Sequence, residues 1–127
     1  MKNSLREKVF EYVAKKYKSK IEYPWQRYPN FAIFRHNDNK KWFGLIGDVA
    51  GTKLGLSEDE KIDILNVKIN DHILLDMLVQ QNGILPAYHM NKENWISILL
   101  DGSVSLEQIF ELVDLSFVAT ASKKTLK

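Results

Sequence analysis

Residues 86–102, Pro-Ala-Tyr-His-Met-Asn-Lys-Glu-Asn-Trp-Ile-Ser-Ile-Leu-Leu-Asp-Gly, join a polar, aromatic loop to an apolar segment. The run from Trp95 to Leu100 predicts a β-strand, and Asp101-Gly102 is a turn signal that ends it. Because both faces of this strand are largely hydrophobic, we expect it in the interior of a sheet. Such a strand would fix the preceding loop while leaving the loop side chains accessible. The candidate ligand-binding residues of this loop are Tyr88, His89, Asn91, Lys92 and Trp95.

Helical and extended patterns alternate along the rest of the chain. Apolar residues at helical spacing predict helices over residues 4–18 and after Ser105, with a shorter one capped by Asn70 or Asp71. Two strands, Phe31–Arg35 and Trp42–Ile46, flank a turn-forming cluster and predict a hairpin, and residues 62–69 alternate as a further strand. The resulting order, α-β-β-β-α-β-α, predicts an α+β fold in which helices flank an antiparallel sheet. We expect residues 1–127 to form one domain.

The composition is that of an ordinary globular protein, with 45% hydrophobic and 27% charged residues. No apolar run is long enough to predict a membrane span, and the first residues lack a signal-peptide pattern. The absence of cysteine excludes disulfides and thiolate chemistry. We therefore expect a cytoplasmic protein, with the oligomeric state left open.

Motifs for catalysis are missing from the sequence. The three histidines, His36, His72 and His89, have no partners at metal-ligand spacing, so we expect neither a metal nor a cofactor. Residues 51–55 are glycine-rich without the order of a phosphate-binding loop, and we expect a flexible connection there. Ser97 lacks the glycine elbow that exposes a nucleophile. A binding protein is the expectation, and a hydrolase without a recognisable motif is the enzymatic alternative.

The charge is distributed unevenly. Residues 1–41 contain eleven Lys and Arg against four Asp and Glu, whereas residues 42–127 contain seven against twelve. A basic end can attract an anionic partner such as DNA, although a solvated, lysine-rich helix gives the same pattern. If DNA binds, the contacts should be weak and mainly to phosphate, because no recognition-helix motif is present. The candidate phosphate-binding residues are Lys15, Lys16, Lys18, Arg35, Lys40, Lys41 and Lys92.

The loop of residues 88–95 supports a second hypothesis, a module for a small anionic ligand or a protein. Its phenol, imidazole, amide and ammonium groups could hydrogen-bond a phosphate or a carboxylate. The structural alternative is that Tyr88 packs inward and Asn91 caps the turn. Trp95 fits a core anchor better than a stacking surface, because it begins an apolar strand.

Two motifs resemble those of the MmcQ/YjbR family. The first is Pro86-x-Tyr-His-Met-Asn-Lys-x-x-Trp95 followed by Leu100-Asp-Gly-Ser103, and the second runs from Arg35 to Leu45 as Arg-His-x-Asp-Asn-x-Lys-Trp-x-Gly-Leu. The resemblance implies a CyaY/frataxin-like α+β fold with no established reaction, for which DNA binding has been suggested from two wing-like hairpins. Asn94 stands where histidine is common and Phe117 where tyrosine is common. Frataxin-like iron binding would need an acidic first helix, and this one is basic.

Overall fold

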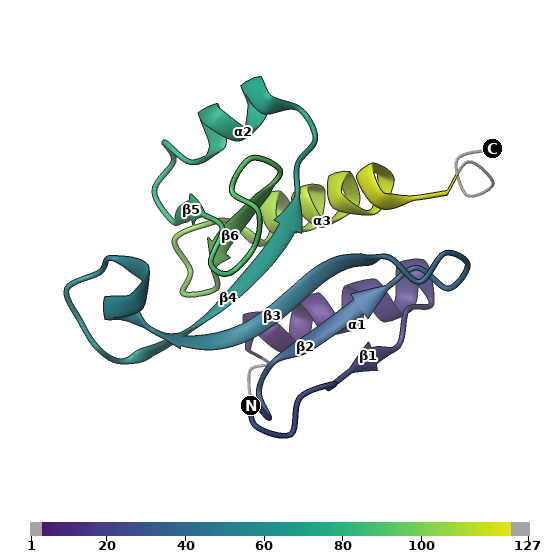
Figure 1. Ribbon diagram of the computed structural model, residues 1–127, viewed down its shortest axis with the longest axis horizontal. Helices are drawn as coiled ribbons and strands as arrows, with labels where there is room; N and C mark the ends of the chain where they lie inside the picture. Colours follow the sequence, from purple (N-terminus) through teal and green to yellow (C-terminus); the bar gives the residue numbers. More distant parts are fainter. Residues whose placement is uncertain (1–3, 123–127) are drawn as a thin grey trace.

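The computed structural model describes residues 4–122, which form a six-stranded antiparallel sheet and three α-helices (Figure 1). The strands lie in the order β1-β2-β3-β4-β6-β5. Their bounds are β1 Ile21–Glu22, β2 Ala32–Arg35, β3 Trp42–Ala50, β4 Lys61–Lys68, β5 Ile84–Pro86 and β6 Trp95–Leu99. The helices are α1 Leu5–Tyr17, α2 His72–Leu78 and α3 Leu106–Thr120, and a 3₁₀ turn, η1, covers Gly51–Leu54.

The α+β class and the antiparallel sheet are confirmed, and β6 is an interior strand paired with both β4 and β5. The predicted order omitted β1 and β5, because two or three residues are too few to establish a period of two. The flexible loop expected at residues 51–55 is a 3₁₀ turn that ends at Gly55 with a φ of 82°. The CyaY-like fold and the single domain stay predictions.

Side-chain caps explain where the three helices begin. The hydroxyl of Ser4 accepts the amide N–H of Glu7 at the start of α1, and that of Ser105 accepts the amide of Gln108 at the start of α3. Asp71 caps α2 through the amides of Ile73 and Leu74. Each cap satisfies amide groups that have no partner within the helix, which contributes about 1 kcal/mol.

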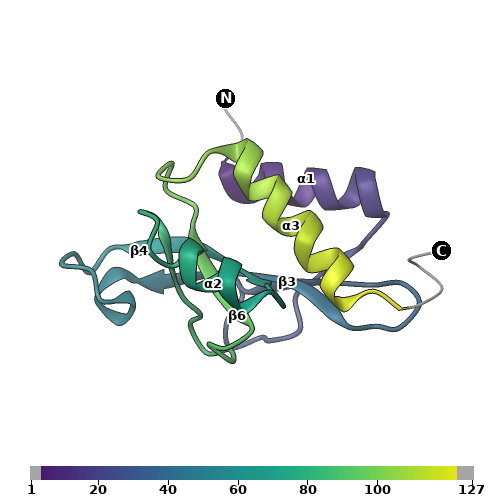
Figure 2. The ribbon, with the colours of Figure 1, turned by 90° about the horizontal axis from the view of Figure 1, so that it is seen from above.

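Helices α1 and α3 cover one face of the sheet (Figure 2). Alternate residues of β4 and β6 point to this face, so Leu65 and Ile98 are fully buried beneath the helices. Phe34 and Phe43 pack edge to face within the same core, with ring centroids 5.1 Å apart. Each such side chain contributes about 1.5–3 kcal/mol by leaving water.

The opposite face of the sheet carries a second, smaller hydrophobic cluster built around Val49, Ile64 and Leu99. Chain segments outside the helices pack on it, since Phe31 and Tyr88 both contact this cluster. The strand register places Leu45, Asn66, Ser97 and Leu85 in one row across the same face. This face is therefore the part of the sheet on which loop residues from distant parts of the sequence meet.

Candidate functional site

A buried polar pair fixes the loop that follows β5. Asn66 on β4 and Ser97 on β6 are register partners, and neither is accessible to solvent. The Ser97 hydroxyl donates to Asn66 Oδ1 at 2.5 Å and accepts the amide N–H of Tyr88 at 2.9 Å. Asn66 Nδ2 donates to the carbonyl of Tyr88 at 3.0 Å. Both backbone polar groups of Tyr88 are thus bound to the sheet, which holds its ring over the open face.

The residue after Tyr88 turns the chain through an uncommon backbone conformation. His89 has a φ of 58°, in the left-handed region that residues other than glycine rarely adopt. Its ring lies at 69° to that of Tyr88, with the two centroids 4.1 Å apart. Asn91 Oδ1 accepts the amide of Glu93 at 2.8 Å, so the turn-capping interpretation of Asn91 is confirmed. The loop presents the Tyr88 and His89 rings as one aromatic wall.

The segment between β1 and β2 supplies the opposite wall. Phe31 lies against the backbone of Gly47, where an added Cβ would come within 2.5 Å of the Phe31 ring. The rings of Tyr28 and Phe31 meet at 5.7 Å between centroids. Trp25 packs edge to face on Trp42 of β3 at the same centroid distance, 5.7 Å. This segment therefore carries three of its aromatic rings onto the open face of the sheet.

Together the two walls border an open cavity of about 330 Å³, here called the aromatic cavity. Its lining is mainly apolar, and its polar groups come from Asn66, His89 and the tyrosine hydroxyls. The lining residues are Trp25, Tyr28, Phe31, Trp42, Leu45, Asn66, Tyr88, His89 and Met90. Apolar lining with few polar groups is typical of sites for small molecules.

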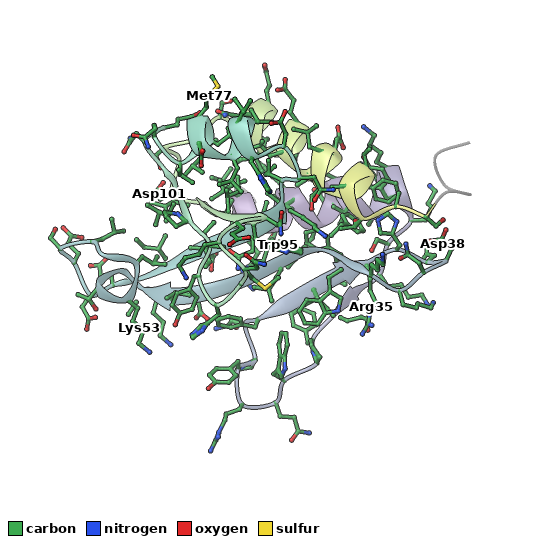
Figure 3. The ribbon with its side chains drawn as sticks, turned by 45° about the horizontal axis from the view of Figure 1, so that its top comes forward. Arg35, Asp38, Lys53, Met77, Trp95 and Asp101 are labelled. Atoms are coloured by element: carbon green, nitrogen blue, oxygen red, sulfur yellow. The ribbon has the colours of Figure 1, made fainter. Side chains whose placement is uncertain are left out.

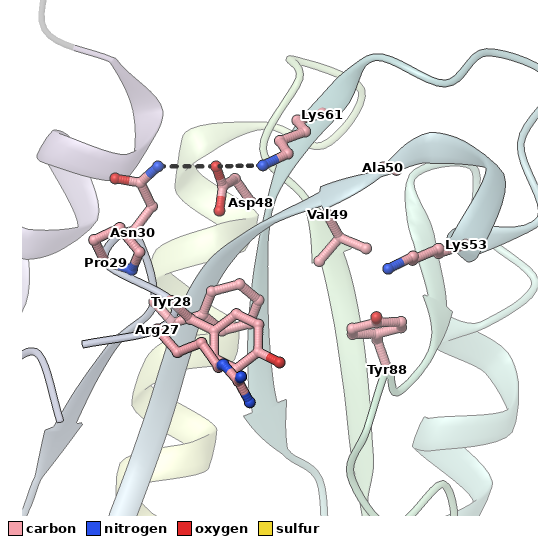
Figure 4. A pocket seen from close by; sticks show the side chains of 11 residues that line it. Arg27, Tyr28, Pro29, Asn30, Asp48, Val49, Ala50, Lys53, Lys61 and Tyr88 are labelled. Carbon is pink, nitrogen blue, oxygen red and sulfur yellow. Dashed lines mark hydrogen bonds and ion pairs between the residues drawn. The ribbon is translucent and has the colours of Figure 1, made fainter. Parts of the chain in front are cut away.

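A second cavity, here called the basic cavity, has a volume of about 240 Å³ and shares Tyr28, Phe31 and Tyr88 with the first. Figure 4 shows its charged residues. Asp48 accepts Asn30 Nδ2 at 2.9 Å and lies 4.0 Å from Lys61 Nζ.

Two cations of this basic cavity have no acidic partner in the part of the chain that the structure describes. Within residues 4–122, no carboxylate oxygen lies within 4.0 Å of the charged groups of Arg27 or Lys53, both of which line the basic cavity. Lys53 also lines a third cavity with His89 and Lys92. Positive charge thus gathers along one side of the aromatic walls.

Within residues 4–122, the predicted phosphate-binding residues fall into two groups, those that pair with a carboxylate and those that do not. Lys16 Nζ lies 3.0 Å from Asp114 Oδ2, and Arg35 donates two hydrogen bonds to Glu22, at 2.7 and 3.1 Å. The pKa of Glu22 is lowered, chiefly by its hydrogen bond from Arg35. The remaining residues of the set, Lys15, Lys18, Lys40, Lys41 and Lys92, are exposed.

These residues do not form one surface with the loop candidates. Arg35 and Lys40 line a hollow with Lys20 near the β2–β3 turn, whereas Lys92 lines the cavity that contains Lys53. Arg35 and Lys53 lie toward opposite ends of the sheet (Figure 3). Apart from Lys92, which belongs to both predicted sets, the predicted DNA-binding residues therefore lie away from the predicted ligand loop.

Only some of the loop residues predicted from sequence line the aromatic cavity. Tyr88 and His89 line the aromatic cavity, whereas Trp95 is half-buried and lines neither the aromatic nor the basic cavity. Trp95 is also absent from both hydrophobic clusters of the described chain, so its prediction as a core anchor was wrong. Asn94 faces His72, with 3.3 Å between Oδ1 and Nε2, so this departure from the family pattern lies outside the cavity.

Sequence reasoning missed Trp25, Tyr28 and Phe31 as site residues. The available signal was the concentration of aromatic residues and prolines between the first helix and the first hairpin. Within residues 4–122, no group of three or more His, Asp or Glu side chains is arranged to hold a metal ion. The same part of the chain contains no helix with the length and apolar character to cross a bilayer.

Known proteins of one family are similar to this chain over most of its length. A protein-family model described as YjbR matches residues 14–119. An uncharacterized protein of Bacillus subtilis, YyaQ, is 47% identical over 91% of this chain and 97% of its own length. The uncharacterized protein YjbR of Escherichia coli K12 is 30% identical over 65% of this chain and 68% of its own. A crystal structure of a Pseudomonas syringae protein is 40% identical, with a TM-score of 0.88 over 91% of this chain and 98% of that one.

Proposed function

The chain belongs to the YjbR family, and we propose that it is a binding protein, not an enzyme, whose ligand places a flat apolar group in the aromatic cavity. The observation that carries this proposal is the attachment of Tyr88 to the sheet through Asn66 and Ser97. The two buried side chains fix the backbone of Tyr88, and a binding site needs a wall that is held in this way.

The size and chemistry of the aromatic cavity support a small ligand. Its volume of about 330 Å³ lies at the lower end of the range for ligand sites, about 300–1,000 Å³. Rings that stack or meet edge to face contribute about 0.5–1.5 kcal/mol per pair beyond their buried area. Because Tyr88 is already held, binding would order few additional groups, which lowers the entropic cost of association.

The test is a titration with N-phenyl-1-naphthylamine, an uncharged aromatic probe whose fluorescence increases in apolar surroundings. We expect saturable binding to one site, weakened in Trp25→Leu because the indole lines the aromatic cavity. Trp95→Leu removes the same group outside that cavity and should bind the probe like the wild type. Absence of saturable binding, or equal affinity in Trp25→Leu and the wild type, would contradict the proposal.

Non-specific nucleic-acid binding is the second candidate function. It is favoured by the exposed lysines Lys15, Lys18, Lys40 and Lys41, which have no acidic partner within 4.0 Å in residues 4–122. Binding through phosphate contacts should weaken steeply between about 50 and 200 mM salt. Fluorescence anisotropy of labelled duplex and single-stranded DNA tests this, and the Lys40→Gln/Lys41→Gln double variant should bind more weakly with a smaller salt slope. Unchanged affinity in that variant would exclude this role for the hairpin.

A further inference from the structure

The aromatic cavity and the basic cavity adjoin each other. Tyr28, Phe31 and Tyr88 line the aromatic cavity and the basic cavity alike. A ring seated in the aromatic cavity between Trp25 and Tyr88 would therefore lie next to the basic cavity. A substituent on that side of the ring would face Arg27 and Lys53. The charges that line the basic cavity then determine whether a cationic or an anionic substituent is favoured there.

Lys53 is placed at this boundary by the η1 turn. The amide of Gly51 donates to the carbonyl of Glu60 at 3.0 Å, and the Thr52 hydroxyl donates to Asp59 at 2.7 Å, which ties the turn to the chain before β4. Leu54 packs on the hydrophobic cluster of the open sheet face. With its neighbours held in this way, the ammonium of Lys53 projects into the basic cavity above the ring of Tyr88 (Figure 4).

The negatively charged side chain that lines the basic cavity already has partners within the protein. Asp48 is the acidic residue that lines it in the described chain, and its carboxylate contacts Asn30 and Lys61. Arg27 and Lys53 keep their charges without such a partner in the same part of the chain. A cationic ligand would meet two unpaired positive charges, whereas an anionic group would gain charge-assisted hydrogen bonds from them.

We propose that the ligand is a small aromatic anion, whose ring occupies the aromatic cavity and whose carboxylate, sulfonate or phosphate group is bound by Arg27 and Lys53. This inference rests on the proposed function, because it specifies the ligand class of the same site. The guanidinium supplies a planar donor pair for two oxygens of the anion, and the ammonium supplies a point charge on its other side.

The experiment compares two probes with one ring skeleton. 8-Anilino-1-naphthalenesulfonate carries a sulfonate that N-phenyl-1-naphthylamine lacks. We expect the sulfonate probe to bind more tightly, and its affinity to fall roughly 10- to 150-fold in Arg27→Gln and in Lys53→Gln, as loss of a hydrogen bond to a charged group predicts. Binding of the uncharged probe should be unchanged in both variants. Lys20→Gln, which removes an exposed lysine before β1 that does not line the basic cavity, is the matched control and should leave both affinities unchanged.

The outcomes separate the two proposals. If the uncharged probe binds in a Trp25-dependent manner and both probes bind equally well, the anion inference is overturned and the proposed function stands. Equal losses for both probes in Lys53→Gln would also overturn it, since a disturbed fold and not a lost charge would explain them. No saturable binding of either probe would overturn both the inference and the proposed function.

Discussion

Ser97 on β6 donates its hydroxyl to Asn66 on β4, and these two buried side chains together bind the amide and the carbonyl of Tyr88. The pair lies in the middle of the sheet, and the positions next to it along the two strands are the apolar residues Leu65, Val67, Ile96 and Ile98. An unsatisfied polar group at such a place would be costly, so the pair and the loop stabilise each other. The interior of the sheet thus determines where the wall of the aromatic cavity lies.

Ser97→Ala should release the loop. The change leaves the amide of Tyr88 without its partner, and we expect the free energy of unfolding to fall by about 1–3 kcal/mol. Urea denaturation measures this loss, and hydrogen exchange should show faster exchange at the amide of Tyr88. Ser57→Ala, at an exposed position before β4, is the control and should change neither quantity. Unaltered exchange at Tyr88 in Ser97→Ala would show that the hydroxyl does not hold the loop.

Gly47→Ala should displace Phe31 from the sheet. The added Cβ would lie 2.5 Å from the Phe31 ring, closer than van der Waals contact permits. Overpacking of this kind costs about 1–3 kcal/mol, and we expect the uncharged probe to bind more weakly because Phe31 lines the aromatic cavity.

A double-mutant cycle identifies the cause of this loss. In a Phe31→Leu background the ring is gone, so Gly47→Ala should destabilise the protein less than it does in the wild type. Urea denaturation of the four proteins gives the coupling energy. Additive effects would mean that the Gly47–Phe31 contact is not what requires glycine at this position.

Asp114→Asn should weaken the attachment of α1 to α3. The carboxylate of Asp114 accepts hydrogen bonds from the hydroxyls of Tyr12 and Tyr17 and from Lys16 Nζ, at 2.5–3.0 Å. Burial opposes ionisation of this carboxyl, but the hydrogen bonds from Tyr17, Lys16 and Tyr12 outweigh it and lower the pKa of Asp114. We expect the substitution to reduce the free energy of unfolding at pH 7 by about 1.5–3 kcal/mol, the range for hydrogen bonds to a charged group.

The pH dependence of this effect follows from the lowered pKa. The unfolded chain binds a proton at Asp114 at higher pH than the folded chain does, so the contribution is complete above the unfolded pKa, near 4. It is lost as the pH falls through the folded pKa. Urea denaturation between pH 7 and pH 3 should therefore show the wild type and Asp114→Asn converging in acid. A constant difference down to pH 3 would contradict this account.

The helices and the hairpin could be predicted because their signals are local. Leu5, Val9 and Val13 repeat at helical spacing behind the Ser4 cap, and Ser105 with Gln108 marks the start of α3 in the same way. The hairpin is determined by two aromatic and branched runs around a turn. Hydrophobic period and capping act within a few residues, so a single sequence is sufficient to recognise them.

The site could be predicted only in part because it depends on contacts between distant segments. Tyr88 and His89 were recognised from their loop, whereas Trp25 and Phe31 become site residues only once the sheet order places their segment opposite that loop. The division of the basic residues has a similar cause, since Glu22 occupies a two-residue strand too short to predict and its carboxylate binds Arg35. Charge counts along the sequence do not reveal such pairings.

His36 is 3% exposed and packs against the rings of Phe43 and Phe117. Its Nε2 is 2.8 Å from the hydroxyl oxygen of Thr120, which itself donates to the carbonyl of Ser116. The hydroxyl oxygen therefore accepts a hydrogen bond from the Nε2–H group, and a neutral imidazole satisfies the arrangement. Burial lowers the pKa of His36 below its usual value of 6.5.

Because the folded state disfavours protonated His36, the unfolded chain binds more protons than the folded one just below pH 6.5. The contribution of the neutral ring is complete above that pH and is lost progressively as the pH falls toward the folded pKa. We expect urea denaturation of the wild type at pH 7.5, 6.5 and 5.5 to show declining stability. His36→Phe keeps a ring against Phe43 and Phe117 but cannot titrate, so its decline over the same range should be smaller. A decline in His36→Phe as steep as in the wild type would assign the titration to another group.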